Sequence, residues 1–133
     1  MKIGDAIQSA DWKNEKHVPA IDVPDVVKAG EPFLVTVSVG KEIPHPNTTA
    51  HHISWIDVFF KPEGDKFLYQ VGHFDFAGHG ASAKGADTGP VYTHPTATFS
   101  MTVDGPGTLV AMEQCNIHGL WENSKELAVE EGK

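Results

Sequence analysis

The sequence of 133 residues predicts an all-β fold, an antiparallel β-sandwich or barrel of immunoglobulin-like size with a short N-terminal helix. Two observations support this prediction. Short apolar or alternating segments recur along the chain and give about seven strands. Turn-forming residues separate them, since the chain holds 13 glycines and 9 prolines. The length suits one domain with its own core, and neither an internal repeat nor a second domain is visible.

The beginning of the chain predicts a helix and then an edge strand. The short helix is expected within residues 1–12, with Asp5 as its cap and Ile3, Ile7 and Trp12 as its apolar residues. Pro19 holds Val18 in an extended conformation, so a strand is expected to start there. The next apolar run contains Pro24, whose missing N–H suits an edge strand.

The later strands are predicted from alternation and from turn residues. In the clearest case every second residue from Phe33 to Val39 is apolar, which places these side chains on one face of a strand. The predicted strands are 33–39, 51–60, 96–103, 108–115 and 125–130, with a hairpin or one long bent strand at 67–76. Loops are expected at 41–50 and in the glycine-rich segment 78–90.

Charge and cysteine content exclude several classes of protein. The chain has 10 lysines, no arginine and 18 acidic residues, and this net charge of −8 argues against binding to nucleic acid. A single cysteine excludes an intramolecular disulfide framework. No membrane-spanning run of about 18 apolar residues and no secretory signal pattern are present. We therefore expect a soluble protein of a reducing cytoplasm.

The only cysteine, Cys115, is followed three residues later by His118, and side chains at this spacing can turn toward one metal ion. A lone cysteine is nevertheless more often a small buried apolar residue. His17 and His45 are also expected on loops, while His51 and His52 open a strand, so that one of these two side chains points to each face. A β-sandwich gathers such strand ends at one rim.

Spacing alone leaves two interpretations of these histidines open. They form a metal site, of which blue copper with two histidines, one cysteine and a weak axial ligand is one version. Alternatively, they are ordinary half-exposed side chains.

Three motifs together distinguish these interpretations. Residues 15–19 read EKHVP, residues 43–53 read IPHPNTTAHHI, and residues 115–121 read CNIHGLW. In this order and spacing they resemble the superoxide reductases of the desulfoferrodoxin family, specifically the one-iron neelaredoxin type. The resemblance extends over nearly the whole chain.

The resemblance implies a mononuclear non-haem iron, Fe²⁺ or Fe³⁺, with four equatorial histidines and one axial cysteine. The implied ligands are His17, His45, His51, His118 and Cys115. The family pattern selects His51 over His52, a choice that alternation could not make. Glu15 matches a carboxylate that binds the ferric ion at a sixth position, and Lys16 matches a cationic residue beside the open site.

The resemblance also implies the reaction and its partners. Superoxide would take up one electron and two protons to give hydrogen peroxide, without producing dioxygen, in defence against oxygen stress. The electron donor of this family is typically rubredoxin, and the seven-stranded immunoglobulin-like barrel often assembles as a homotetramer. Related desulfoferrodoxins carry an additional four-cysteine domain that this sequence lacks, so residues 1–133 are expected to form a single catalytic iron domain. Neither nucleic acid nor a membrane is expected as a partner.

Two other classes of protein share part of this pattern. A cupredoxin-like electron carrier has a β-sandwich and a similar Cys-x-x-His loop, but it usually has a methionine just after the last histidine, where this chain has Gly119. A metal-free immunoglobulin-like binding module would have no reason to gather the histidines and Cys115. Four further histidines are expected at the surface or rim: His52, His73, His79 and His94.

Overall fold

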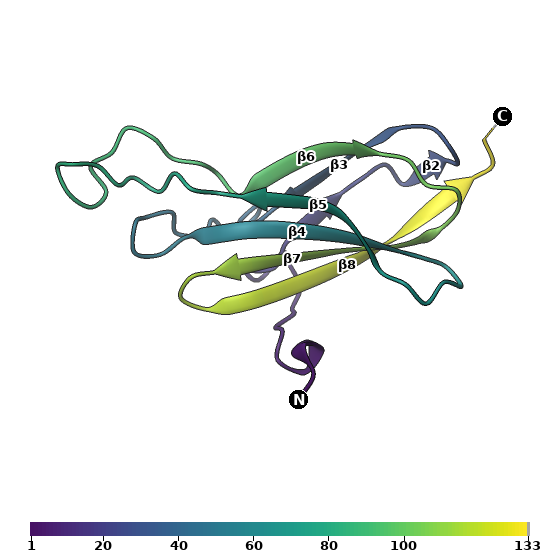
Figure 1. Ribbon diagram of the computed structural model, residues 1–133, viewed down its shortest axis with the longest axis horizontal. Helices are drawn as coiled ribbons and strands as arrows, with labels where there is room; N and C mark the ends of the chain where they lie inside the picture. The colour runs from purple at the N-terminus through teal and green to yellow at the C-terminus, as the bar shows by residue number, and fades with distance from the viewer. Residues whose placement is uncertain (133) are drawn as a thin grey trace.

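Eight strands form two facing sheets in the computed structural model, which describes residues 1–132 (Figure 1). The three-stranded sheet has the order β1 (Ala20–Asp22), β3 (Phe33–Ser38) and β6 (Thr96–Met101). The five-stranded sheet has the order β2 (Val26–Lys28), β8 (Gly119–Glu130), β7 (Gly107–Cys115), β4 (Ile53–Pro62) and β5 (Tyr69–Asp75). The predicted all-β sandwich is confirmed.

The segment around Pro24 explains why there are eight strands where about seven were expected. It forms two short edge strands, β1 in the smaller sheet and β2 in the larger one, and the chain crosses between the sheets at Pro24. Proline cannot donate a ladder hydrogen bond, so such a crossing is a suitable place for it. β2 pairs parallel with β8, so the sandwich is antiparallel except at this pair.

The core lies between the sheets and is built from alternate residues of the facing strands. Val35 and Val37 of β3 are 0% exposed, as are Val58 of β4 and Leu109 and Ala111 of β7. Burying each valine or leucine side chain contributes roughly 1.5–3 kcal/mol to folding. This burial holds β4 and β7 of the larger sheet against β3 of the smaller one.

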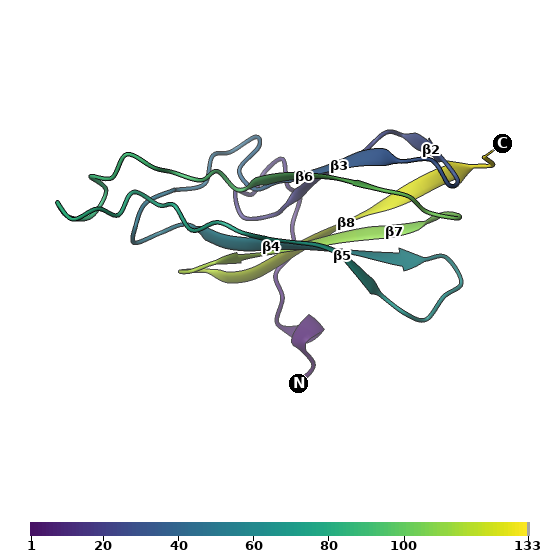
Figure 2. The ribbon, with the colours of Figure 1, turned by 45° about the horizontal axis from the view of Figure 1, so that its top comes forward.

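The N-terminal helix is much shorter than the sequence suggested. It is a single 3-10 turn, Ile3–Asp5, with no buried residue. The prediction of Asp5 as its cap is wrong, because Asp5 is the last residue of the turn and accepts a hydrogen bond from the N–H of Lys2 at 3.0 Å. Without an apolar face to bury, a helix of this length gains too little from packing to extend. This turn belongs to the N-terminal arm, residues 1–10, and lies away from both sheets (Figure 2).

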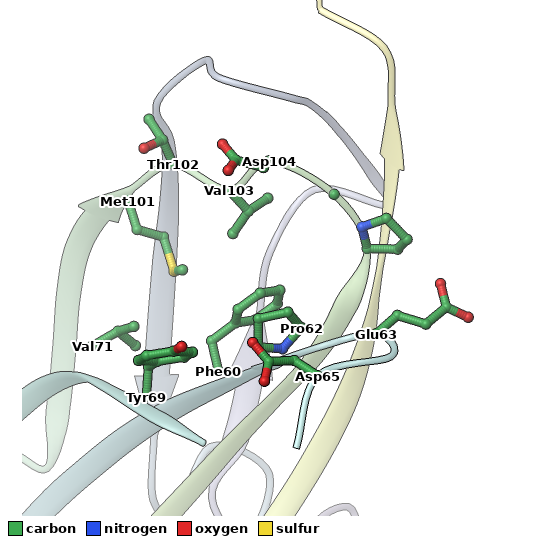
Figure 3. A pocket seen from close by; sticks show the side chains of 12 residues that line it. Phe60, Pro62, Glu63, Asp65, Tyr69, Val71, Met101, Thr102, Val103 and Asp104 are labelled. Atoms are coloured by element: carbon green, nitrogen blue, oxygen red, sulfur yellow. The ribbon is translucent and has the colours of Figure 1, made fainter. Parts of the chain in front are cut away.

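The two ends of the sandwich differ. At one end lie the start of β4, the end of β7 and the loop 41–52. At the opposite end, an open pocket of about 580 Å³ lies between the end of β4 and the turn before β7, where Phe60, Tyr69 and Met101 surround it (Figure 3). Within residues 1–132, no helix has the length and apolar character needed to cross a membrane.

Candidate metal centre

Four potential ligands from distant parts of the chain meet at the end of the sandwich where β4 begins and β7 ends. His17 precedes β1, His45 and His51 lie in the loop between β3 and β4, and Cys115 ends β7. Their ligand atoms all lie within 4.8 Å of one another. Cys115 and His17 are buried, at 1% and 5% exposure, while the other two are half-buried.

His118 adds a fifth donor on the solvent side of this cluster. Its Nδ1 lies 3.2 Å from Nε2 of His17 and 3.7 Å from Sγ of Cys115. The turn between β7 and β8 is tight, because Cys115 pairs with Gly119, whose φ of 79° favours glycine. This turn also directs the N–H of His118 to Sγ of Cys115 at 3.4 Å. All five residues that the sequence proposed as ligands thus lie together.

The hydrogen bonds of the histidine rings fit a metal ion. Nδ1 of His45 lies 2.6 Å from the carbonyl oxygen of Pro46, so this nitrogen must be the donor and Nε2 keeps its lone pair. Nε2 of His45 and Nε2 of His51 are buried and have no hydrogen-bond partner among residues 1–132. Buried polar atoms rarely remain unpaired. A metal ion bound at this cluster would satisfy both nitrogens.

The same burial keeps the imidazoles neutral. Burial lowers the pKa of His45 to about 4, although the hydrogen bond to Pro46 opposes this shift. The pKa of His51 is also lowered, first by burial and then by the neighbouring His118 and His17. Metal binding requires deprotonated ligands. At neutral pH these rings therefore have lone pairs free to bind a metal ion.

Glu15 and Lys16 lie beside the cluster. Oε1 of Glu15 accepts hydrogen bonds from the N–H of His17 at 3.0 Å and from its Nδ1 at 2.6 Å. Burial opposes ionisation of Glu15, but these bonds from His17 outweigh it and lower the pKa of the carboxyl. After burial and the neighbouring histidines, the positive charge of Lys16 is a smaller cause of the lowered pKa of both His45 and His51.

The remaining histidines lie outside the cluster. His52 stacks on His79 with ring centroids 3.6 Å apart. His73 of β5 pairs with Asp57 of β4 and with Asp75 of its own strand. His94 is exposed.

Two residues at the centre were missed as functional candidates. Glu113 is 0% exposed and lies two residues before Cys115 on the inward face of β7. Neither of its oxygens has a hydrogen-bond partner within residues 1–132, and burial raises its pKa to about 9. An interaction with the backbone of Cys115 opposes this shift only in part, so the carboxyl is neutral at pH 7. Strand alternation was the available signal, because it places Glu113 on the same face as Leu109 and Ala111.

Trp121 is the second of these residues. Its indole stacks on the imidazole of His17, with centroids 4.7 Å apart and planes 14° from parallel. No sequence pattern indicated this contact, because it joins residues from opposite ends of the chain.

Comparisons with known proteins agree with this arrangement. The family model described as desulfoferrodoxin matches residues 9–124. The neelaredoxin of Megalodesulfovibrio gigas is 61% identical over 129 residues, which cover 97% of this chain and 99% of that protein. The superoxide reductase of Pyrococcus furiosus is 52% identical, over 94% of this chain and 98% of its own.

Solved structures give the same result in three dimensions. A candidate superoxide reductase from Thermotoga maritima superimposes with a TM-score of 0.95 at 52% identity, covering 98% of both chains. The reduced neelaredoxin of Archaeoglobus fulgidus superimposes with a TM-score of 0.85 at 54% identity, covering 92% of this chain and 98% of its own.

Proposed function

The chain belongs to the desulfoferrodoxin family as a superoxide reductase of the neelaredoxin type, and we propose that its reaction takes place at one iron ion bound by four histidines and one cysteine. The proposed ligands are His17, His45, His51, His118 and Cys115. The observation that carries the proposal is the convergence of ligand atoms from four of these residues to within 4.8 Å. Residues 1–133 would form a single catalytic domain.

Iron, when bound, supplies the electron that converts superoxide, with two protons, into hydrogen peroxide without releasing dioxygen. The protein contributes Cys115 as an anionic donor, and thiolate ligands increase electron density at iron. The N–H of His118 at 3.4 Å from Sγ moderates this donation. Imidazoles that bind a metal ion are neutral, so Cys115 gives the donor set about one negative charge, which is smaller than the positive charge of a ferrous ion. An anionic substrate is therefore attracted to the centre.

Two residues beside the cluster complete the proposal. We assign Lys16 to the attraction of superoxide and to the orientation of a water that supplies a proton. Glu15, which bonds His17 here, would become an oxygen ligand of the oxidised ion, because the harder ferric ion favours oxygen donors.

The resemblance to the family supports three further proposals, on the electron donor, the assembly and the location. We propose that an external donor, rubredoxin or a similar carrier, reduces the iron. We also propose that the protein is a homotetramer and acts in the cytoplasm.

Replacement of Cys115 tests the proposed centre. Cys115→Ser should abolish both the thiolate-to-iron absorption band of the oxidised protein and superoxide reduction, because one side chain provides both. Metal analysis and an absorption spectrum are the measurements. Copper in the purified protein would favour a cupredoxin-like carrier, and a Cys115→Ser variant that stays coloured and active would exclude the assignment.

Adjacent histidines provide a matched control. His51→Gln should lower iron content, because Nε2 of His51 is a buried nitrogen without another partner within residues 1–132. His52→Gln should not, because His52 stacks on His79 outside the cluster. Equal loss of iron in both variants would contradict the choice of His51.

A further inference from the structure

The ring of His17 is restrained from two sides. Its Nδ1 donates to Glu15 at 2.6 Å, which fixes the tautomer and leaves Nε2 facing His118 and the rest of the cluster. Its face lies against the indole of Trp121, 14° from parallel. The hydrogen bond defines which nitrogen is free, whereas the stack defines the tilt of the ring. Both matter, because the lone pair of Nε2 lies in the ring plane.

Trp121 also contacts the turn between β7 and β8, which carries His118. Its Nε1–H donates to the carbonyl oxygen of His118 at 3.2 Å. Two residues further along β8, Nδ2 of Asn123 donates to the carbonyl oxygen of Pro19 at 2.8 Å. The start of β8 thus holds the chain on both sides of the cluster, after His17 and around His118.

The N-terminal arm braces this part of β8. β7 covers one edge of β8, but β2 joins the other edge only at Ala128–Glu130, so that edge is open beside Trp121. Gln8 fills it with two backbone hydrogen bonds. The N–H of Gln8 donates to the carbonyl of Leu120 at 3.0 Å, and the N–H of Glu122 donates to the carbonyl of Gln8 at 2.9 Å.

The contacts of the N-terminal arm and of His17 meet at Trp121. The two bonds of Gln8 lie on either side of Trp121, and Gln8 pairs with Trp121 as a parallel bridge. Within residues 1–132, no other backbone hydrogen bond joins residues 1–10 to the sheets. The 3-10 turn of the arm buries no side chain. The arm is therefore attached to the sandwich at the residue that contacts His17.

We propose that Trp121 is a positioning residue that sets the tilt of His17, and that the N-terminal arm holds Trp121 in place through Gln8. The expected consequence of this positioning is slower loss of the metal ion, and this consequence rests on the proposed iron centre. Groups that orient metal-binding histidines typically change metal affinity about 10- to 100-fold when removed. An effect at the lower end is expected, because Glu15 still restrains the same ring.

Substitutions at Trp121 separate the stack from the hydrogen bond. Trp121→Leu should speed the release of bound ferrous iron to a chelator about 10-fold, because the flat contact is lost. Trp121→Phe keeps an aromatic face and should stay within about 3-fold of the wild type. Trp55→Leu is the control, because it makes the same substitution at another half-buried tryptophan. Trp55 lies on β4, between the buried Ile53 and Ile56. Equal rates of release from Trp121→Leu and Trp55→Leu would overturn the proposal.

Nuclear magnetic resonance of the metal-free protein gives a readout that does not depend on iron. The side-chain nitrogen signals of His17 should broaden in Trp121→Leu and stay sharp in Trp121→Phe, because only the first frees the ring. If Trp121→Leu fails to fold, broad His17 signals in Trp121→Phe would overturn the role of the stack. A wild-type protein that binds no metal but shows this pattern would refute the proposed function and leave the positioning role supported.

The arm is tested through the N–H of Gln8. Gln8→Pro removes this donor and should speed metal release about 3-fold and broaden the His17 signals, because Trp121 loses its brace. Ala10→Pro places the same residue in the arm without removing either bond to β8, so it should behave as the wild type. Equal effects of the two prolines, or none from Gln8→Pro, would refute the role of the arm.

Discussion

The proposed function gives the carboxylate of Glu15 two different partners, His17 and the oxidised iron. In the structure its Oε1 is bonded to the backbone N–H and to Nδ1 of His17. As a ligand of oxidised iron it would have to leave at least the ring nitrogen. If Glu15 binds the oxidised ion as proposed, it would link the restraint on His17 to the oxidation state of the centre.

Replacing Glu15 separates binding from chemistry. Glu15→Ala should keep most of the initial rate with superoxide while opening the oxidised centre to added anions such as azide, because the carboxylate no longer competes. Pulse-radiolysis kinetics and an azide titration followed by absorption are the measurements. Loss of nearly all reaction in the first encounter would instead identify Glu15 as a proton donor.

The individual residues of the centre were predictable to different degrees. Cys115 and His118 were visible from their spacing, whereas strand alternation could not choose between His51 and His52, and only the family pattern did. Glu113 was missed, although its place in an alternating strand would have put a carboxyl in the core. Contacts between distant segments, such as Trp121 on His17, leave no local pattern in a sequence.

At the scale of elements, β4 and β5 carry a small charge cluster on their outer face. His73 of β5 pairs with Asp57 of β4 and lies 3.3 Å from Asp75. The hydrogen bond to Asp57 and its charge raise the pKa of His73. The folded protein therefore binds this proton more tightly than the unfolded chain does.

This shift predicts a pH dependence of stability. The stabilisation by His73 is fully present below its unfolded pKa of 6.5 and is lost as pH rises through the raised folded pKa. His73→Gln should therefore melt below the wild type in acid and match it in base. The gap should be small, because exposed ion pairs contribute little. Thermal melts at pH values from below 6.5 to above the raised pKa measure this difference in melting temperature, with His94→Gln as the control variant. A difference between His73→Gln and the wild type that grows with pH would contradict the assignment.

Elements were best predicted where packing and alternation agree. β3 follows from the apolar alternation between residues 33 and 39, and its buried face matches. The start of β8 was missed, because Glu122, Asn123 and Ser124 are polar and their strand depends on pairing with β7. The N-terminal helix was overpredicted, since its apolar residues have no sheet to pack against.

At the scale of the whole molecule, two electric fields act on the substrate in opposite directions. The net charge of −8 repels superoxide at long range. In the proposed centre, bound iron and Lys16 would attract it at short range. Salt screens interactions beyond about 10 Å at ordinary ionic strength, so the distant carboxylates weaken first.

Replacing Lys16 tests which of the two fields governs the encounter. A charge ~6 Å from the substrate is worth ~0.7 kcal/mol in water and ~3 kcal/mol at an intermediate dielectric. Lys16→Ala should therefore slow the second-order reaction with superoxide between ~3-fold and ~100-fold. The wild-type rate should fall as salt is added, and the variant should be less sensitive to salt.

Lys61→Ala separates the position of the charge from its amount. Lys61 lies near the end of β4, at the opposite end of the sandwich from the cluster, and its removal changes the net charge by the same amount. If the local field governs the encounter, this variant keeps both the rate and the salt dependence of the wild type. If both lysine variants slow equally, or if the wild-type rate rises with salt, the repulsion by the whole molecule dominates. Lys16 would then be an ordinary surface lysine.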